Sequence, residues 1–209
     1  MVYYFTLACD PSVICYMGRD KHENEELIRW GWPEDLWFHV DKLSSAHVYV
    51  RLPRGFDFDT ITPDMVEECS QLVKANSIMG CKQNDVRVVY TPWANLKKTG
   101  DMDVGQVAYH DQKLQKFHTI HKKNTAMLNA LEKTKITKED HEVNFCEMRM
   151  ERNQRVAKED REIARLKAEE EVKERERRQK AHDEKHYVTM NEDYMMTDNS
   201  NAPDEDDFM

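Results

Sequence analysis

Hydrophobic and polar residues alternate most regularly between Trp32 and Leu52, and this pattern predicts two β-strands joined by a turn. The strands cover residues 35–41 and 46–51. One face of the predicted hairpin is apolar and consists of Leu36, Phe38, Val40, Ala46, Val48 and Val50. The other face combines aromatic rings with ionisable groups and consists of Trp37, His39, Asp41, His47, Tyr49 and Arg51. This second face is expected to be either a partly solvated layer or a surface that contacts a ligand.

Shorter alternating stretches predict further strands, and helical spacing predicts two packed helices. The strands are expected at residues 2–7, 13–17, 85–91, 104–110 and 117–121. A short helix is predicted with Asn24 as its N-cap and Gly31 at its end. A longer helix is predicted to begin at Thr62-Pro63, to pack an apolar stripe on the sheet and to end at Gly80.

The chain becomes strongly charged and helical after about residue 124. Met127, Leu128 and Leu131 are placed to dock on the preceding domain, whereas the sequence beyond Lys138 consists largely of Glu, Lys and Arg. Opposite charges three and four residues apart stabilise an isolated helix, and the apolar residues form no clean heptad seam. A solitary exposed helix of roughly 40 to 50 residues is therefore predicted. Pairing with a partner helix is the alternative.

Together these elements predict an α+β fold in which an antiparallel or mixed sheet packs against helices. The domain is expected to span residues 1–125, and a long charged helix or coiled-coil region is expected to span residues 126–187. Residues 188–209 contain seven acidic and no basic side chains, so we expect them to form a disordered acidic tail.

The formal net charge of −9 conceals an uneven distribution of charge along the chain. Residues 1–73 carry 6 basic and 13 acidic side chains, whereas residues 74–137 carry 11 basic and 5 acidic side chains. The second part of the domain is therefore positive, and its lysines are suited to meeting phosphate groups. The alternative is that these lysines serve only to keep the surface soluble.

Cysteine content and hydropathy bear on the cellular compartment. The five cysteines form no CxxC pair, and the N-terminal residues do not resemble a secretory signal, which favours reduced thiols in the cytosol or nucleus. No window approaches the roughly 18 consecutive apolar residues that a membrane-spanning helix needs. A cytoplasmic protein is therefore expected, with a nuclear location or membrane association by another route as alternatives.

Two regions are candidates for contact with nucleic acid. Residues 18–23 combine a glycine, basic side chains and a helix start, which together favour phosphate binding. Basic residues after residue 90 lie near Trp93 and Tyr109, and cations among aromatic rings suit both phosphates and exposed bases. The predicted contact residues are Arg19, Lys21, His22, His39, Lys42, His47, Lys74, Trp93, Lys97, Lys98, Lys113 and Lys116. The alternatives are an ordinary solvated loop at residues 18–23 and a Trp93 that anchors the core or its rim.

An enzymatic or metal-binding role has little support in the sequence. His39, Asp41 and His47 are the best candidates for metal ligands or a proton relay, but hydrogen-bonded sheet residues are the simpler interpretation. No HExxH, GxSxG, phosphate-binding-loop or dinucleotide-binding glycine pattern accompanies them. We therefore expect a protein without catalytic residues, metal, cofactor or small-molecule substrate.

Several segments carry a resemblance to a known family. The quoted stretches are YMGRDKHENEELI, WPEDLWFHVDKLSSAHVYVRL, VKANSI, VVYTPWANLKK and DMDVGQVAYH. Together with the charged C-terminal part, they resemble the NFACT-R domain family, and most closely its stand-alone eukaryotic members. The same domain occurs in the larger NEMF-type proteins of ribosome-associated quality control.

The resemblance implies recognition of nucleic acid, above all structured RNA such as ribosomal RNA or tRNA, in a translation-linked setting. The other modules of the NEMF-type proteins are lacking, so their tail-elongating activity is not implied. One alternative is DNA binding by the same basic surface, including a membrane-associated DNA sensor. Another is an adaptor that binds a ribosomal or other protein partner through the long helix.

Overall fold

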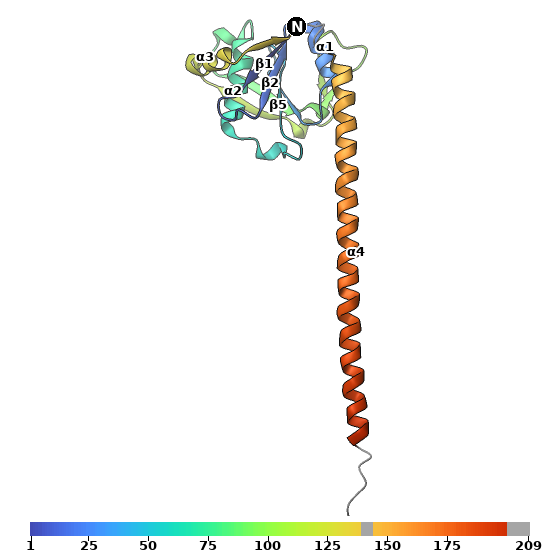
Figure 1. Ribbon diagram of the computed structural model, residues 1–209. Helices are drawn as coiled ribbons and strands as arrows, with labels where there is room; N and C mark the ends of the chain where they lie inside the picture. The colour runs from blue at the N-terminus through green and yellow to red at the C-terminus, as the bar shows by residue number, and fades with distance from the viewer. Residues whose placement is uncertain (139–143, 200–209) are drawn as a thin grey trace, which may run out of the picture. The chain divides into compact units, whose positions relative to one another are not determined.

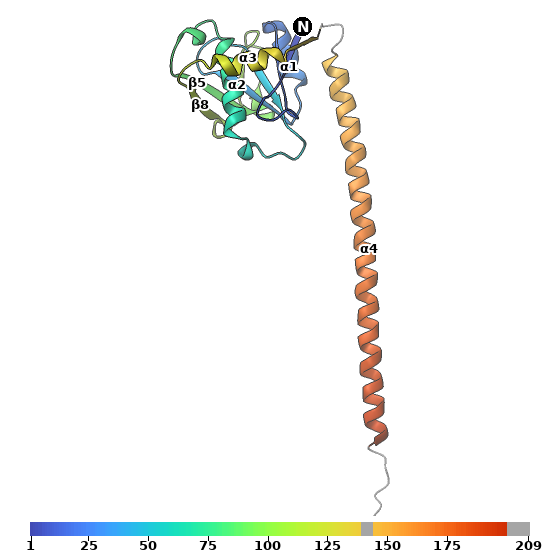
Figure 2. The same ribbon diagram turned by 60° about the vertical axis from the view of Figure 1, so that its left-hand side comes forward.

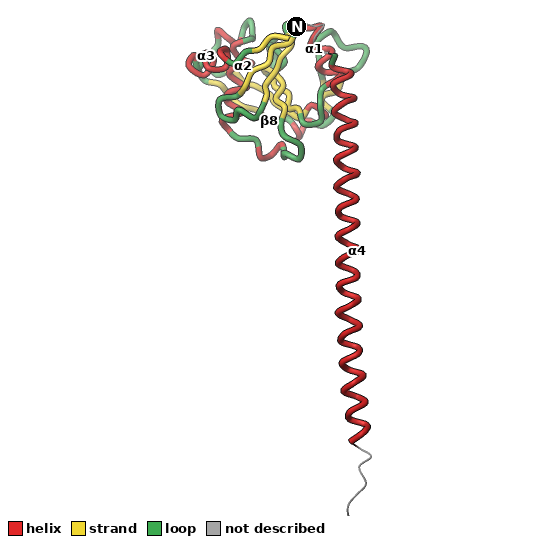
Figure 3. Tube along the Cα trace, viewed as in Figure 1, coloured by secondary structure: helices red, strands yellow, loops and turns green. Residues whose placement is uncertain are grey.

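The computed structural model describes residues 1–138 and 144–199, with side chains as far as residue 188. It divides into two units, Met1–Arg152 and Asn153–Met209, each of which is considered by itself. In the described part of the first unit, seven strands form one antiparallel sheet (Figures 1 and 3). These strands are β1 (Val2–Thr6), β2 (Ile14–Gly18), β3 (Asp35–Val40), β4 (Val48–Arg51), β5 (Val86–Pro92), β8 (Lys116–Ile120) and β9 (Ile136–Lys138). Their order across the sheet is β8-β5-β3-β4-β2-β1-β9, and the predicted α+β class is confirmed.

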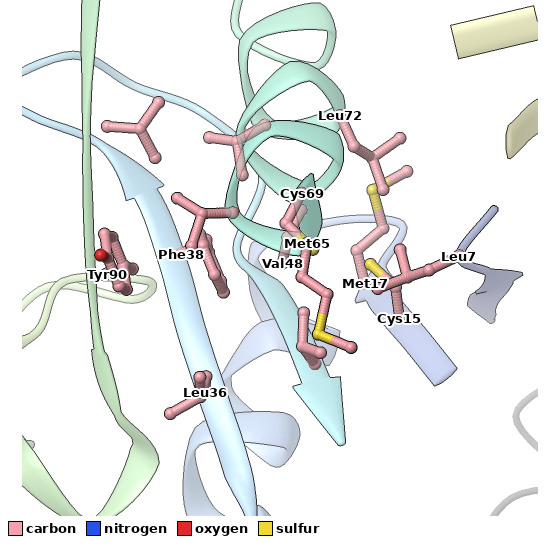
Figure 4. Packing of buried hydrophobic residues seen from close by; sticks show 14 of the residues in the cluster. Leu7, Cys15, Met17, Leu36, Phe38, Val48, Met65, Cys69, Leu72 and Tyr90 are labelled. Carbon is pink, nitrogen blue, oxygen red and sulfur yellow. The ribbon is translucent and has the colours of Figure 1, made fainter. Parts of the chain in front are cut away.

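One face of the sheet holds the larger apolar core, which helix α2 (Pro63–Ala75) covers (Figure 2). As predicted, the Thr62 hydroxyl caps this helix by accepting from the Met65 N–H, and proline occupies the first turn. Figure 4 shows Met65 and Cys69 of α2 packed beside the strand residues Phe38 and Val48. Apolar side chains at helical spacing on α2 thus meet apolar side chains at strand spacing on the sheet, which explains the stability of this layer.

The opposite face of the sheet carries a second, more aromatic cluster. Tyr16, Trp37 and Tyr49 are buried in it, and Leu27 of helix α1 (Lys21–Trp30) packs on them. The short ribbon of β6 (Leu96–Lys97) and β7 (Ala108–Tyr109) also contributes partly buried residues to this cluster.

The predicted hairpin is confirmed as β3 and β4. The two strands pair antiparallel, with Asp35 opposite Arg51 and Phe38 opposite Val48. The residues predicted for its apolar face contribute to the larger core. Trp37 and Tyr49 of the second predicted face belong to the aromatic cluster. Period-two alternation therefore identified correctly which side of each strand faces which layer.

Two predicted helix boundaries were wrong. The N-cap of α1 is Asp20, whose Oδ1 accepts from the N–H groups of His22 and Glu23, whereas Asn24 is buried inside the helix. Helix α2 ends at Ala75 with Asn76 as its C-cap, because the Asn76 side chain donates to the Leu72 carbonyl.

Gly80 lies beyond the end of α2, in the 3-10 helix Gly80–Lys82. The strand predicted at residues 104–110 is reduced to β7, because Gly105 adopts a positive φ of 85° and its N–H is held by Glu25. The other 3-10 helices in the described residues are Phe58–Thr60, Trp93–Asn95 and Gln112–Leu114.

The first unit extends past the predicted boundary at residue 125. Asn124 caps helix α3 (Thr125–Lys133), from which Leu131 is buried in the larger core. Strand β9, which was not predicted, then pairs with β1 and forms one edge of the sheet.

Helix α4 (Phe145–Asn199) begins in the first unit and makes up the described part of the second. Exposed ion pairs such as Glu174–Arg178 lie along it at the predicted spacing, which confirms the long charged helix. The helix continues as far as Asn199, into the segment predicted to be a disordered tail, and residues 200–209 lie outside the described part. In the portion that the structure describes, no helix has the length and apolar character needed to cross a membrane.

Candidate nucleic-acid interface

Trp37, His39 and His47 form a packed cluster on the second face of the hairpin, close to its turn. The Trp37 Nε1–H donates to His47 Nδ1 at 2.9 Å. The His39 ring lies nearly parallel to the Trp37 ring, with 5.4 Å between the ring centroids. Burial, reinforced by the neighbouring His39, lowers the pKa of His47 to about 3, and burial also lowers the pKa of His39. Both rings are therefore neutral near pH 7, and His47 serves as a buried hydrogen-bond acceptor.

An open groove of about 590 Å³ lies beside this cluster and brings together segments that are far apart in the sequence. Arg19 lines it from the loop before α1, Lys21 lines it from the start of that helix, His39 and His47 line it from the hairpin, and Gly105 lines it from the loop before β7. Four of the predicted contact residues therefore share one groove, whose volume falls within the usual range of ligand pockets.

The loop before α1 offers side-chain charge but few unsatisfied backbone donors. Asp20 accepts from the first N–H groups of the helix, and the Glu23 carboxylate accepts from the Arg19 N–H at 2.6 Å. The helix start is thus capped from within the chain. The side chains of Arg19, Lys21 and His22 remain exposed, so any contact with phosphate at this loop and the first turn of α1 involves these side chains.

Three of the predicted lysines already have structural partners. Lys74 is only 1% exposed and donates to the Ile120 carbonyl at 3.2 Å, so its ammonium group is not available at the surface. Lys98 donates to the Glu25 carboxylate at 2.7 Å and also to two backbone carbonyls of the loop before β7. Lys116 pairs with Asp59 at 2.6 Å.

The remaining predicted lysines are exposed but are not gathered in one place. Lys42 lies in the hairpin turn with a positive φ of 61°, Lys97 lies on β6, and Lys113 lies in a 3-10 helix. Lys122 and Lys123, which follow β8, are exposed as well. The positive part of the domain therefore presents scattered cations in addition to the groove.

Trp93 occupies the anchoring position that was the alternative to a stacking platform. Its Nε1–H donates to the Ile28 carbonyl at 2.8 Å. Its ring lies so close to Gly31 that a Cβ atom there would be 2.2 Å from the ring nitrogen. The Arg149 guanidinium lies 5.1 Å from the centroid of the same ring. Trp93 thus joins the end of α1 to the start of α4 and offers little free surface for stacking on a base.

A second polar cluster lies at the opposite end of the hairpin, and the sequence interpretation missed it as a site. Arg51 donates to both carboxylate oxygens of the fully buried Asp35, at 2.9 and 3.0 Å. The Tyr16 hydroxyl donates to the same carboxylate at 2.6 Å, and the Trp32 N–H donates at 2.7 Å. The Arg51 guanidinium also stacks on the Trp32 ring, 3.6 Å from its centroid.

The start of α4 adds two more arginines to this cluster. Arg152 forms an ion pair with Glu34, and both side chains are largely buried. Burial lowers the pKa of Arg149, and the charge of Arg152 lowers it further. Arg51 stands out in the sequence as part of the second hairpin face. No sequence signal separates Arg149 and Arg152 from the other charged residues of α4, because the residues that they contact, Trp93 and Glu34, lie far earlier in the sequence.

The chemistry of both clusters suits anion binding and stacking better than coordination of a cation. Within the described residues, no three His, Cys, Asp or Glu side chains are arranged to hold a metal ion. His39 and His47 lie together, with 4.8 Å between their ring centroids, but Nδ1 of each ring already makes a hydrogen bond within the chain.

Residues 1–111 match the family described as NFACT protein RNA binding domain. Coiled-coil domain-containing protein 25 of Bos taurus is 48% identical over 214 residues, which cover the whole of both chains. The protein of that name from Mus musculus is 59% identical over 140 residues, or 66% of this chain and 67% of the relative. Protein JLP2 of Saccharomyces cerevisiae is 37% identical over 123 residues, or 57% of this chain and 59% of the relative.

The fold is similar to that of a solved structure, the C-terminal part of the fibronectin/fibrinogen-binding protein from Streptococcus suis. The TM-score is 0.51 at 22% identity, and the match covers 64% of this chain and 49% of that one. The family match covers residues 1–111, more than half of the chain, and includes both strands of the hairpin and every residue that lines the groove. The chain therefore belongs to the family of the NFACT protein RNA binding domain.

Proposed function

We propose that this chain is a non-enzymatic module that binds structured RNA in a translation-linked setting in the cytoplasm. The observation that carries the proposal is the coincidence of the family match with the groove. All groove residues, from Tyr3 to Gly105, lie within the matched residues 1–111. Arg19 and Lys21 supply exposed positive charge at this groove, and His39 supplies a half-buried neutral ring. Positive side chains bind phosphate groups, and an aromatic ring beside them stacks on an unpaired base. This combination suits the loops and ends of RNA, where bases are unpaired.

The proposed binding is tested with the full chain and three probes, namely an RNA hairpin, a single-stranded RNA and a DNA duplex. Affinity is measured over a series of salt concentrations, because phosphate-driven binding weakens linearly in log–log form as salt is raised. The Arg19→Gln/Lys21→Gln double variant is expected to weaken RNA binding roughly tenfold or more and to reduce the salt slope by about 1 to 2. The Lys74→Met variant is the control, because it removes a lysine that is buried.

The outcomes separate the proposal from its alternatives. Preference for the RNA hairpin over the DNA duplex supports it, and equal or tighter binding of DNA favours the DNA-binding alternative. Absence of binding to all three probes at low salt overturns the proposal.

An adaptor role through α4 is a second candidate, because one observation favours it. Ile163, Leu166 and Val172 expose about half of their surface on this helix. Apolar side chains in a charged helix suit pairing with a partner helix. Binding of that kind would resist added salt and would be lost when residues 153–209 are removed.

A further inference from the structure

The start of helix α4 carries a second site, which no family feature assigns. We infer that Arg51, Arg149 and Arg152 form a binding site for a single phosphodiester group of a nucleic acid. This inference rests on the proposed RNA binding and extends it to residues outside the matched range of 1–111.

The charges of the cluster do not balance. Three guanidinium groups lie around two carboxylates, with Arg51 on Asp35 and Arg152 on Glu34. The fifth group, Arg149, has no acidic partner of its own among the described residues, although its pKa responds to all four of these neighbours. The cluster therefore has an excess of one positive charge in a poorly solvated place. One monoanion, such as a phosphodiester, balances it.

The cluster also contains an unsatisfied hydrogen-bond donor on Arg149. Nη1 of Arg149 is buried, and among the described residues it has no hydrogen-bond partner. A buried N–H group of a cation without a partner is unfavourable, so such groups in folded proteins call for an explanation. In the proposed site, a phosphate oxygen accepts from this nitrogen.

Aromatic rings lie beside two of the three arginines. Arg51 lies on the ring of Trp32, and Arg149 lies over the ring of Trp93. Stacking on a flat ring restrains a guanidinium while its edge presents a planar fork of donors. The fork of Arg51 is occupied by Asp35, so in the proposed site the fork of Arg149 meets the phosphate oxygens. Lysines lack this fork. A cluster built from arginines therefore favours specific binding of a phosphate group over nonspecific attraction of anions.

Solvent reaches part of the cluster. Arg51 exposes 23% of its side chain, and Arg149 is only partly buried. All five charged groups belong to the unit Met1–Arg152, so the site does not depend on the placement of the rest of α4. The site lies at the end of the hairpin away from the turn, whereas the groove lies beside the turn.

The experiment compares two substitutions of the same type in the full chain. Arg149→Gln removes the charge from the cluster, and Arg155→Gln removes the same charge from an exposed position on α4. Binding of a single-stranded RNA and an RNA hairpin is measured across a salt series, well below the melting temperature of each variant. Arg149→Gln is expected to weaken binding about tenfold and to reduce the salt slope by about 1, whereas Arg155→Gln is expected to have little effect.

Thermal melting without RNA provides the second readout. Because Nη1 of Arg149 has no hydrogen-bond partner among the described residues, Arg149→Gln is expected to leave the melting temperature unchanged or to raise it. Arg152→Gln removes the partner of Glu34 and is expected to lower it. Arg149→Lys keeps the charge without the fork and is expected to give an intermediate RNA affinity.

Equal affinity of the Arg149→Gln and Arg155→Gln variants overturns the inference while leaving the proposed function intact. A melting temperature that falls in Arg149→Gln as it does in Arg152→Gln, with RNA affinity preserved, also overturns it, because Arg149 is then a structural partner of Glu34. If the unsubstituted chain binds neither RNA, the proposed function fails, and this inference fails with it.

Discussion

His47 accepts the indole N–H of Trp37 through Nδ1 at 2.9 Å, and both side chains are almost completely buried. Protonation of Nδ1 would replace this acceptor by a second donor facing the indole N–H. The neutral form of His47 is therefore built into the hairpin.

This contact makes the stability of the domain sensitive to acid. The pKa of His47 is about 3 in the folded chain and about 6.5 in an unfolded chain, so between these values the unfolded state binds more protons. The free energy of unfolding is expected to fall as pH is lowered through this window, by up to about 1.4 kcal/mol per pH unit. Urea denaturation at a series of pH values from neutral to moderately acidic measures this slope.

Asn supplies an acceptor near the position of Nδ1 but does not titrate in this range. The His47→Asn variant is therefore expected to reduce the slope, while the buried His39 retains part of it. His22→Asn is the control, because His22 is exposed. An unchanged slope in His47→Asn would contradict this explanation of the acid sensitivity.

Gly31 is expected to tolerate no side chain. A Cβ atom at this position would lie 2.2 Å from Trp93 Nε1, so Gly31→Ala displaces the ring and breaks its hydrogen bond to the Ile28 carbonyl. The expected loss of stability is about 1–3 kcal/mol, which is typical of overpacking, and tryptophan fluorescence should change with it. Gly100→Ala is the matched control, because no atom in the described part of the chain lies within 4 Å of the added Cβ. Equal denaturation midpoints for the two variants would show that the Gly31 contact is not restrictive.

Asp35 is expected to be the most important single carboxylate for stability. Asp35→Ala leaves Arg51, the Tyr16 hydroxyl and the Trp32 N–H without their shared acceptor. Loss of one partner of a buried ion pair costs about 3–5 kcal/mol, and chemical denaturation monitored by circular dichroism measures it. Asp59→Ala breaks an exposed pair with Lys116 and should cost less than about 1 kcal/mol. Similar costs for the two variants would argue against a special role of the Asp35 cluster.

The independent domain is expected to end near Arg152. Removal of residues 153–209 should leave the denaturation midpoint of the domain unchanged, because the first unit ends at Arg152. Removal of residues 139–209 should lower the free energy of unfolding by about 2 kcal/mol or more, because Phe145 no longer packs on the aromatic cluster. Phe145→Ala in the full chain should reproduce much of this loss. A domain of residues 1–138 as stable as that of residues 1–152 would show that the start of α4 is dispensable.

Much of the fold could be predicted because its central elements obey simple periodicities. The alternation in the hairpin assigned Leu36 and Phe38 to one layer and Trp37 to the other, as the structure shows. The end of α2 was harder to predict, because a side-chain cap at Asn76 stops the helix before the glycine does. Strand β9 was missed because its three residues are all exposed and gain their strand conformation only by pairing with β1.

The candidate site was less predictable than the fold, because sequence shows charge but not pairing. Lys74 and Lys98 have the same sequence character as Lys97, yet one is buried and the other is held by Glu25. The sequence indicated the loop before α1 and the hairpin as separate candidate regions, but it did not indicate that they share one groove. The cluster around Arg149 depends on residues far earlier in the chain, such as Glu34 and Trp93, which no local pattern encodes.

The pairing of β9 with β1 has a consequence for the order of events during synthesis. Strand β1 is synthesised before the other strands of the sheet, but the strand that protects its outer edge is among the last parts of the domain to emerge. Until then, the nascent chain carries an open strand edge that is able to pair with other chains.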